Sequence, residues 1–393
     1  MATISKQLFD FLPEFSADGS GSDQRDTIES LLKKALDAPL NYPPLAESIF
    51  PGDRVAILIQ NALPAAVETL ESLICVLEKL RIETSDIIIV VPTAMKSTFD
   101  LVENSDADPE SIMPATWRMK SDDRQAPLLF ELHAIDDDQA VSYLAANVQG
   151  DPVYVNRTLC DSDVILPLSY RTPNKKQSDC LYPEFSTGET RQRFRKKKDS
   201  ASQRTQETEL ANDSLGLFFS IELICRPGDA IEEVVCGSRA EARKVALEKL
   251  EPLWILHADD DCDAVITTIE STPESTTWAN IIRAVNSAAT HVVDGPIIVW
   301  SELSEKPNAK VKAACSAQFD GSVPDSLSKK LQHFASILCE RPVYLKSRLS
   351  QNVVEGLGLG FVESAESVER IMRSHGKPLL IRDGHLREIA NRE

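Results

Sequence analysis

Two loops hold the positions where an α/β protein is expected to carry its chemistry. Val55–Ile59 and Ile87–Val91 are continuous apolar runs of strand length, and the residues between them place apolar side chains at helical spacing. A β-α-β unit of this kind binds ligands on the loops that leave the carboxyl ends of its strands. These loops are Gln60–Pro64 and Pro92–Thr98, and neither contains a histidine, a cysteine or a carboxylate. The frame therefore resembles that of an enzyme, whereas its loops lack the usual catalytic side chains.

Three other segments have compositions that could do chemistry, but each has a simpler explanation. The acidic run Asp259–Asp263 could bind a hard cation, but it lacks the glycine and the terminal glutamate of a calcium loop, which favours a solvated loop. Gly356–Gly360 lacks the Lys-Ser/Thr ending of a phosphate-binding loop and is interpreted as a turn between a helix and a strand. Basic residues gather in Arg191–Lys198, where phosphate or an acidic partner could bind, and a solvated linker is the preferred interpretation.

The composition limits the class of protein. The chain has 393 residues, of which 42% are hydrophobic and 26% charged, as is typical of a globular protein with more than one domain. A formal charge of −19 argues against general nucleic-acid binding. No apolar run reaches the roughly 18 residues that span a bilayer, and the amino terminus has no signal-peptide core, so a cytoplasmic protein without membrane association is predicted. Eight cysteines without C-x-x-C spacing are expected to be reduced.

The elements that must position any site alternate between strands and helices, which predicts an α/β fold of two α/β domains with mainly parallel sheets and a cleft between them. The expected divisions are a flexible segment at 1–27, an amino-terminal domain at 28–185, a polar basic linker at 186–213 and a carboxyl-terminal domain at 214–393.

Within the first domain the pattern predicts a further strand at 164–168 and a helix near 138–147, and a hairpin is expected to open the second domain around Arg226–Asp229. The remaining elements of the second domain are predicted as a helix at 239–252, strands at 264–269, 296–300, 342–346 and 378–381, and helices at 277–292, 323–339 and 365–374.

Taken together, the segments resemble the nickel-pincer lactate racemase family over most of residues 30–385. The segments that carry the resemblance follow the family's order and are Ala46–Ile59, Asn156–Leu166, Leu217–Arg243, Trp278–Ala289 and His375–Gly384. The resemblance implies an active site that uses a nickel-bearing pyridinium pincer cofactor tethered to a lysine, with two histidines as the acid–base pair. Racemising a 2-hydroxy acid needs a hydride acceptor and a proton-transfer group on each face of the substrate. A further histidine of the family binds the metal.

The two loops that hold substrate and acid–base groups in the family correspond to residues of different chemistry here. The family's Asp-x-Thr-Arg-Pro loop corresponds to Gln60–Pro64, which keeps only the proline. Its histidine-bearing loop corresponds to Thr93–Thr98, which has no histidine. The residues at the positions where the family keeps its chemistry are Gln60, Leu63, Met95 and Thr98.

The positions of the cofactor lysine and the metal-binding histidine also differ. The lysine falls near Asp179, with Lys175 and Lys176 close in sequence, and the metal-binding histidine corresponds to Arg195. The six histidines of the chain lie away from the motif positions, at 133, 257, 291, 333, 375 and 385. These departures predict a chain without the pincer cofactor and without a bound metal.

One pair of family residues has close counterparts. Where the family has a glutamine and a lysine three residues apart on a helix, this chain has Asn280 and Arg283, which preserve the amide and the positive charge. The leading hypothesis is a divergent member that has lost the racemase reaction and binds a small anionic ligand, or a partner, through these two residues. The alternative is an active 2-hydroxy acid racemase, epimerase or related isomerase whose site is rearranged around Lys175, Lys176 and Arg283. A structural interaction protein is the third option.

Overall fold

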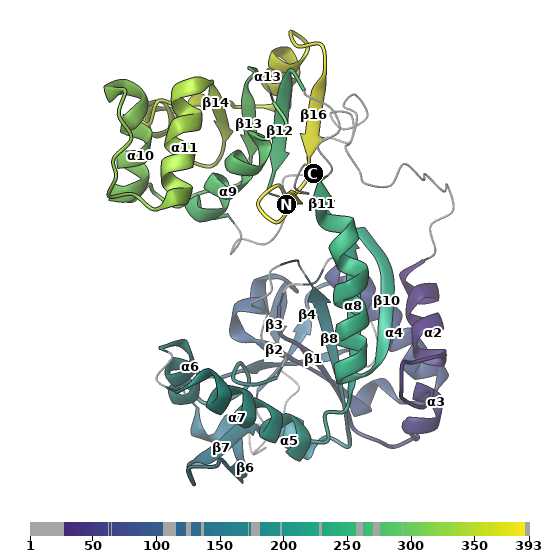
Figure 1. Ribbon diagram of the computed structural model, residues 1–393. Helices are drawn as coiled ribbons and strands as arrows, with labels where there is room; N and C mark the ends of the chain where they lie inside the picture. Colours follow the sequence, from purple (N-terminus) through teal and green to yellow (C-terminus); the bar gives the residue numbers. More distant parts are fainter. Residues whose placement is uncertain are drawn as a thin grey trace. The chain divides into compact units, whose positions relative to one another are not determined.

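The computed structural model describes residues 27–389, except 62, 64, 105–114, 123–126, 135–136, 172, 174–180, 197–198, 228–229, 257–261, 270–275 and 293. The chain forms two compact units, each with its own sheet (Figure 1). Among the described residues, the first unit comprises those up to Cys225 together with Ile231–Leu250, and the second comprises those of Arg226–Ala230 and those from Glu251 on. The α/β fold class predicted from the sequence is confirmed.

An eight-stranded sheet forms the centre of the first unit. Its strands in spatial order are β10 (Ala230–Ser238), β9 (Phe219–Arg226), β8 (Val164–Arg171), β1 (Val55–Ile59), β2 (Ile87–Pro92), β5 (Leu129–His133), β4 (Thr116–Met119) and β3 (Leu101–Glu103). The five strands from β9 to β5 are parallel, whereas β4 and β3 extend the sheet in antiparallel register.

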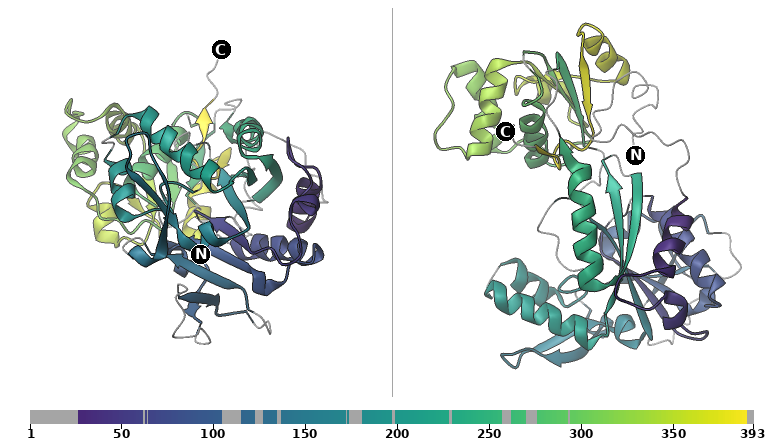
Figure 2. Two further views of the ribbon diagram at one scale, coloured as in Figure 1. Left: turned by 90° about the horizontal axis from the view of Figure 1, so that it is seen from below. Right: turned by 45° about the vertical axis from the view of Figure 1, so that its right-hand side comes forward.

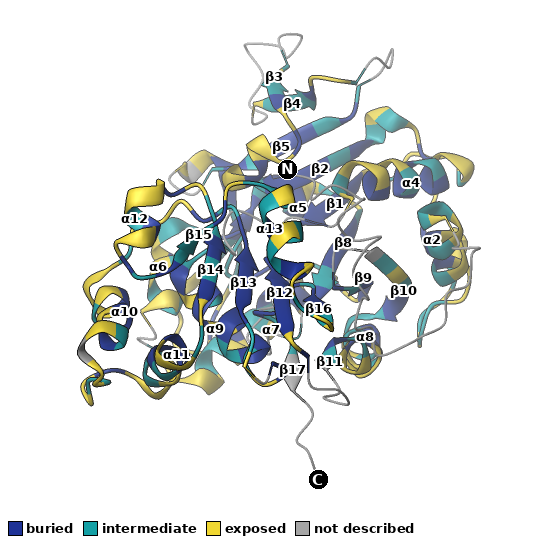
Figure 3. Cartoon of the chain, turned by 90° about the horizontal axis from the view of Figure 1, so that it is seen from above, coloured by how far each residue is buried: buried dark blue, intermediate teal, exposed yellow. Residues whose placement is uncertain are grey.

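Both faces of this sheet are buried, which explains why its central strands are continuous apolar runs. Val55, Ile57 and Ile59 of β1 pack into the core beneath α2 (Ile28–Asp37) and α4 (Ala66–Lys79). Their neighbours along β1, Ala56 and Leu58, point into the opposite core with α5 (Arg157–Asp161) and α7 (Ala201–Ser214). Figure 3 shows the sheets as the dark, buried centre of each unit and the outer helix faces as exposed.

Several short elements complete the first unit. They are α3 (Leu45–Ser48), η1 (Thr84–Asp86), η2 (Thr93–Ser97), η3 (Asp138–Ala140), β6 (Val141–Ala146), β7 (Pro152–Asn156) and α6 (Gly188–Arg195). The predicted helix near 138–147 is wrong, because β6 pairs with β7 as an antiparallel ribbon after a single 3-10 turn.

The predicted linker at 186–213 is also folded, since it contains α6 and most of α7. Ion pairs neutralise the basic block that favoured a solvated segment: Arg191 pairs with Glu184 at 2.5 Å, and Arg193 pairs with Asp199 at 2.5 Å and with the buried Glu207. The repulsion expected of a basic run is therefore absent at these two arginines.

The two strands of the predicted hairpin are present and are neighbours in the first sheet, whereas residues 228 and 229 of its turn lie outside the described residues. β9 pairs with β8, and α8 (Arg239–Trp254) then runs alongside β10, as both Figure 1 and the right-hand view of Figure 2 show. Residues expected at the start of the carboxyl-terminal domain thus complete the amino-terminal unit. The reason is that strand pairing between Leu168–Arg171 and Ile221–Ile224 decides which sheet the segment joins.

The second unit contains a five-stranded parallel sheet. Its spatial order is β15 (Gly360–Phe361), β14 (Val343–Lys346), β13 (Ile297–Trp300), β12 (Ala264–Thr268) and β16 (Pro378–Ile381). One face packs on α9 (Trp278–Ala288), α10 (Ala309–Asp320) and α11 (Lys329–Glu340), and the other on α13 (Ala365–Met372). The remaining elements are α12 (Gln351–Glu355), β11 (Ile255–Leu256) and β17 (Glu388–Ile389).

Most sequence predictions for this unit are confirmed within a few residues, and α10 was not predicted. Trp278 and Trp300 are buried in the core, and Gly356–Gly360 is the expected turn between α12 and β15. Within the described part of the chain, every helix is too short or too polar to cross a bilayer.

Candidate functional site

The two loops that lack the usual catalytic side chains follow β1 and β2 in the first unit, and their apolar residues pack in the core. The strand order reverses between β1 and β8. A ligand is therefore expected to bind at the carboxyl edge of the sheet, where these two strands end. Leu63 and Met95 are buried in the unit's core, whereas Thr98 is exposed. The side chain of Lys96 lies over the ring of Trp117, 3.7 Å from its centroid. Two of the four positions that hold chemistry in the resembling family therefore pack the interior.

A buried ion pair joins Arg171, the last residue of β8, to Glu222 in the middle of the neighbouring strand β9. The guanidinium of Arg171 donates from Nε to Glu222 Oε2 at 2.8 Å and from Nη2 to Oε1 at 3.2 Å. The two side chains are only 5% and 1% exposed. Because this bidentate ion pair is buried from solvent and satisfies both charges, neither side chain is available to bind a ligand.

A second buried polar cluster lies at the carboxyl end of β5. Asn156 Nδ2 donates to Glu131 Oε1 at 2.5 Å, Thr158 donates to the other carboxyl oxygen, and His133 Nε2 contacts the Ser186 carbonyl at 3.0 Å. Burial raises the pKa of Glu131, although both hydrogen bonds oppose the rise. Burial also lowers the pKa of His133. These groups satisfy one another and tie β5 to α5, which is a structural arrangement.

The second sheet has its reversal of strand order between β12 and β16. The chain passes from β12 through α9 to β13 on one side and returns much later to place β16 on the other side. The crevice at the carboxyl ends of these two strands is the position where open α/β sheets bind ligands. Thr267 and Thr268 end β12, and Asp383–His385 form the turn after β16.

The turn after β16 is held tightly against β12. Asp383 has a φ of 48°, and its backbone N–H donates to Thr268 Oγ1 at 3.3 Å, while the Gly384 N–H donates to the Thr268 carbonyl at 3.3 Å. Position 384 must be glycine, because a Cβ there would lie 2.1 Å from Thr267 Oγ1. The close approach fixes His385 beside the end of β12.

His385 and Thr267 bring unsatisfied polar atoms to this crevice. His385 is 6% exposed and Thr267 fully buried, yet His385 Nδ1 and Thr267 Oγ1 have no hydrogen-bond partner among the described residues. Buried polar atoms are nearly always hydrogen-bonded to protein or water. Their isolation points to a bound water or ligand as the missing partner.

Asn280 and Arg283, the two residues singled out from the sequence, lie together on α9 beside this histidine. Arg283 Nη1 donates to Asn280 Oδ1 at 3.4 Å, and Arg283 is exposed while Asn280 is half-buried. Burial lowers the pKa of His385, the carboxylate of Asp383 partly opposes this, and the charge of Arg283 adds to the lowering. Arg283 is thus close enough to influence the protonation of the imidazole.

The amino terminus of α9 is already occupied by protein groups. Glu305 accepts a hydrogen bond from the backbone N–H of Trp278 at 3.0 Å, and the side chain of Thr277 caps the helix. An anion that entered the crevice would therefore be bound by the guanidinium of Arg283 rather than by the helix terminus. Together, a guanidinium, an amide, a neutral imidazole and a hydroxyl can bind a small carboxylate and a neighbouring hydroxyl.

The residues at the pincer positions do not fit that group. By the resemblance, the metal-binding histidine corresponds to Arg195, which is exposed on α6 and whose guanidinium offers no lone pair to a metal. Within the described residues there is no group of three or more His, Cys, Asp and Glu side chains arranged to hold a metal ion. Lys175, Lys176 and Asp179 lie outside the described residues, as do Asp259–Asp261 of the acidic run.

Comparison with known proteins relates the chain by fold. No protein-family model and no curated protein matches the sequence. The lactate racemase apoprotein from Thermoanaerobacterium thermosaccharolyticum matches with a TM-score of 0.51 and 14% identity, over 93% of this chain and 93% of that chain. A protein from Thermotoga maritima matches with a TM-score of 0.50 and 12% identity, over 92% of this chain and 97% of that chain. The chain therefore has an α/β fold similar to that of lactate racemase.

His385, Asp383 and Thr267 were missed by the sequence reasoning. His385 was grouped with the histidines that lie away from the family's motifs, because no motif position corresponds to it. A local signal does exist, since Asp383-Gly384-His385 directly follows the last predicted strand, where parallel sheets bind ligands. The sequence does not show which strand lies next to this one. In the structure β16 pairs with β12, which brings residue 385 close to residue 267 and within electrostatic range of residue 283.

Proposed function

We propose that this chain is a divergent relative of lactate racemase that has lost the nickel-pincer reaction and binds a small carboxylate at the carboxyl edge of its second sheet. Arg283 would hold the carboxylate, Asn280 would orient it, and His385 would contact a hydroxyl or carbonyl oxygen on the neighbouring carbon. The observation that carries the proposal is that Arg283 lies within electrostatic range of His385, a buried imidazole whose Nδ1 has no partner among the described residues.

The replacement of several family groups at once supports binding without racemisation. A single proton-transfer group contributes about 10²–10⁴-fold to a rate. Here the acid–base loop has Thr93–Thr98 without a histidine, and the metal position has Arg195. One buried imidazole also serves one face of a substrate, whereas racemisation needs a proton-transfer group on each face.

An active epimerase or isomerase is the second candidate, because the neutral imidazole of His385 could move a proton within its reach. In that case the pincer positions would be replaced by a different arrangement that includes Lys175 or Lys176. Binding and catalysis separate cleanly in solution, since only the second interconverts enantiomers.

The test is calorimetric titration of D- and L-lactate into the wild type, Arg283→Gln and the matched control Arg370→Gln. Arg370 is exposed on α13, so its loss changes the net charge equally. We expect the Arg283 variant to bind about tenfold more weakly or worse, because hydrogen bonds to charged groups contribute about 1.5–3 kcal/mol. Equal affinities of the two variants would contradict the site.

Metal analysis and intact mass of the purified chain test the loss of the cofactor. The proposal predicts the unmodified mass and no stoichiometric nickel. A covalent adduct on a lysine, or chiral chromatography that shows conversion of one lactate enantiomer into the other, would instead establish the active-enzyme candidate.

A further inference from the structure

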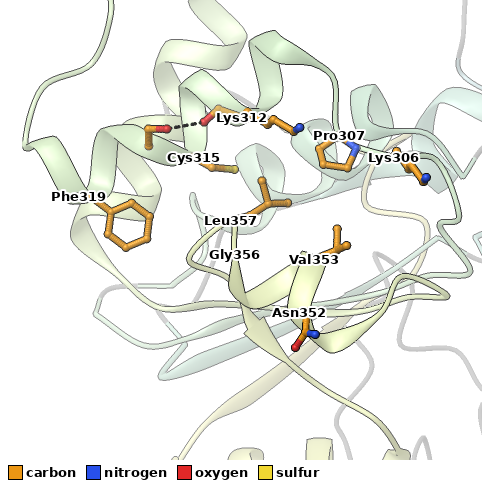
Figure 4. A pocket seen from close by; sticks show the side chains of 10 residues that line it. Lys306, Pro307, Lys312, Cys315, Phe319, Asn352, Val353, Gly356 and Leu357 are labelled. Atoms are coloured by element: carbon orange, nitrogen blue, oxygen red, sulfur yellow. Dashed lines mark hydrogen bonds between the residues drawn. The ribbon is translucent and has the colours of Figure 1, made fainter.

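A pocket in the second unit lies apart from the residues of the proposed carboxylate site. It has a volume of about 570 Å³, which falls within the range of small-molecule sites. The segment between β13 and α10, the helix α10, and α12 with the turn that follows it form its walls (Figure 4). The described lining residues are Lys306, Pro307, Lys312, Cys315, Ser316, Phe319, Asn352, Val353, Gly356 and Leu357.

Hydrogen bonds and close packing hold the two walls together. Gln318 of α10 donates from Nε2 to the Leu357 carbonyl at 2.7 Å and to the Cys315 carbonyl at 2.9 Å. Gly358 has a φ of 75°, and a Cβ there would lie 2.7 Å from Phe319 Cζ, so the turn after α12 fits closely against the end of α10. Cys315 and Leu357 are buried behind the pocket. The pocket is therefore preformed.

The two ends of the pocket differ in chemistry. In Figure 4 the ammonium ends of Lys306 and Lys312 lie on the side of Pro307, whereas Phe319 lies at the opposite end, and Leu357 and Val353 lie between them. Phe319 is 68% exposed, so a ligand in the pocket could cover its apolar ring. A ligand that filled the pocket would cover apolar surface along most of its length and meet positive charge at one end.

The charge of the pocket is opposite to that of the chain. Its described lining includes two lysines and no Asp or Glu, although the chain carries 61 acidic and 42 basic residues. Two cations at one end of an apolar pocket complement an anionic head group on an apolar chain. A cationic amphiphile would be repelled, and a neutral one would gain from the apolar part alone.

We propose that this pocket binds a monocarboxylate with an unbranched apolar chain of medium length. The carboxylate is held by Lys306 and Lys312, and the chain lies along Pro307, Val353 and Leu357 toward Phe319. This site differs from the one at Arg283, since it binds an amphiphile and shares none of the residues Asn280, Arg283 and His385.

Displacement of 11-(dansylamino)undecanoate, followed by its fluorescence, tests the proposal with three ligands of one chain length below their micellar concentrations. We expect decanoate to displace the probe, decanol to do so at least about tenfold more weakly, and decyltrimethylammonium not to compete. Equal displacement by all three, or no binding of the probe, would overturn the proposal.

Variants locate the binding. Lys306→Gln/Lys312→Gln should weaken decanoate binding roughly tenfold, because each exposed ion pair contributes up to about fivefold. The control Lys310→Gln/Lys329→Gln removes the same charge from exposed positions outside the lining and should bind as the wild type does. Phe319→Ala should weaken decanoate and decanol alike. Equal loss in both double variants would show a general charge effect and contradict the site.

The two sites of the second unit are expected to be independent. Lys306→Gln/Lys312→Gln should leave lactate binding unchanged, and Arg283→Gln should leave decanoate binding unchanged. A loss of decanoate binding in Arg283→Gln would overturn the separate pocket without deciding whether lactate binds at Arg283.

Discussion

The carboxyl edges of the two sheets differ in whether their charged groups already have partners. At the first edge, Arg171 and Glu222 form a dry two-point ion pair, and Lys96 lies over Trp117. At the second edge, Arg283 is exposed, and the neighbouring His385 has a buried ring nitrogen without a partner among the described residues. Both edges have the parallel topology that usually binds ligands.

The topology of a sheet identifies where a ligand could bind. Whether the polar groups at that position already have partners indicates whether they are available for binding. A charge that is paired and desolvated stabilises its own unit and has little to offer a ligand. An exposed guanidinium beside an unsatisfied imidazole can gain new hydrogen bonds on binding. We therefore expect the first edge to contribute to stability and propose that the second edge binds a carboxylate.

The largest expected effect comes from breaking the ion pair of the first edge. Arg171→Met leaves the carboxylate of Glu222 buried without its cation, which costs about 3–5 kcal/mol when a buried pair loses one partner. Hydrogen-exchange mass spectrometry of peptides from β8 and β9 measures the free energy of opening of this unit. The half-exposed pair of Lys249 with Glu233 is the matched control, and Lys249→Met should cost less than about 1 kcal/mol.

A double variant separates lost pairing from lost packing. Arg171→Met/Glu222→Leu removes both charges and should recover most of the protection, because an apolar pair of similar volume replaces a buried ion pair well. If the double variant is as unstable as Arg171→Met alone, the loss would lie in packing, and the electrostatic interpretation of this edge would be wrong.

A smaller effect is expected from Glu131, through pH. Burial raises the pKa of Glu131 in the folded unit above that of the unfolded chain, so the stability from this group is present at low pH and falls as the pH rises through the window between the two pKa values. Glu131→Gln removes this penalty and should be more stable than the wild type at pH 8, by an amount that grows as the pH rises.

The measurement is the difference between the exchange stabilities of β5 peptides in Glu131→Gln and the wild type, from pH 5 to pH 8. Burial lowers the pKa of His133, so its contribution has the opposite sign: stability from this group is lost as pH falls below its unfolded value. Because both proteins keep His133, the difference isolates Glu131. A difference that does not grow with pH would contradict a raised pKa of Glu131.

The sequence predicted most strands well because both faces of each sheet are buried. β1 and β16 have the predicted bounds, since each is an apolar run of strand length between polar turns. The segment at 138–147 was predicted as a helix because its apolar residues suit either period, and pairing with β7 decides in favour of a strand. The region at 186–213 is folded, and Arg193 there forms ion pairs with Asp199 and Glu207. The number of charges in a segment does not show which acidic side chains will pair with its arginines.

The candidate site could be predicted in part. Asn280 and Arg283 were singled out through the resemblance, because they stand where the family has a glutamine and a lysine three residues apart, and the structure places the two side chains together on one helix. His385, Asp383 and Thr267 come from two strands separated by more of the chain than any local pattern spans, and they meet only because β12 pairs with β16. The pocket lined by Lys306 and Lys312 likewise depends on α10, a helix that the sequence pattern did not indicate.

The most direct test of the account follows the histidine side chains by NMR while lactate is added to histidine-labelled protein. The signal of His385, assigned with His385→Gln, should shift with the same midpoint as the calorimetric titration, and the shift should be lost in Arg283→Gln. The signal of His133, buried in the first unit, should stay unchanged. A His385 signal that does not move at saturating lactate would contradict a carboxylate site at the second edge.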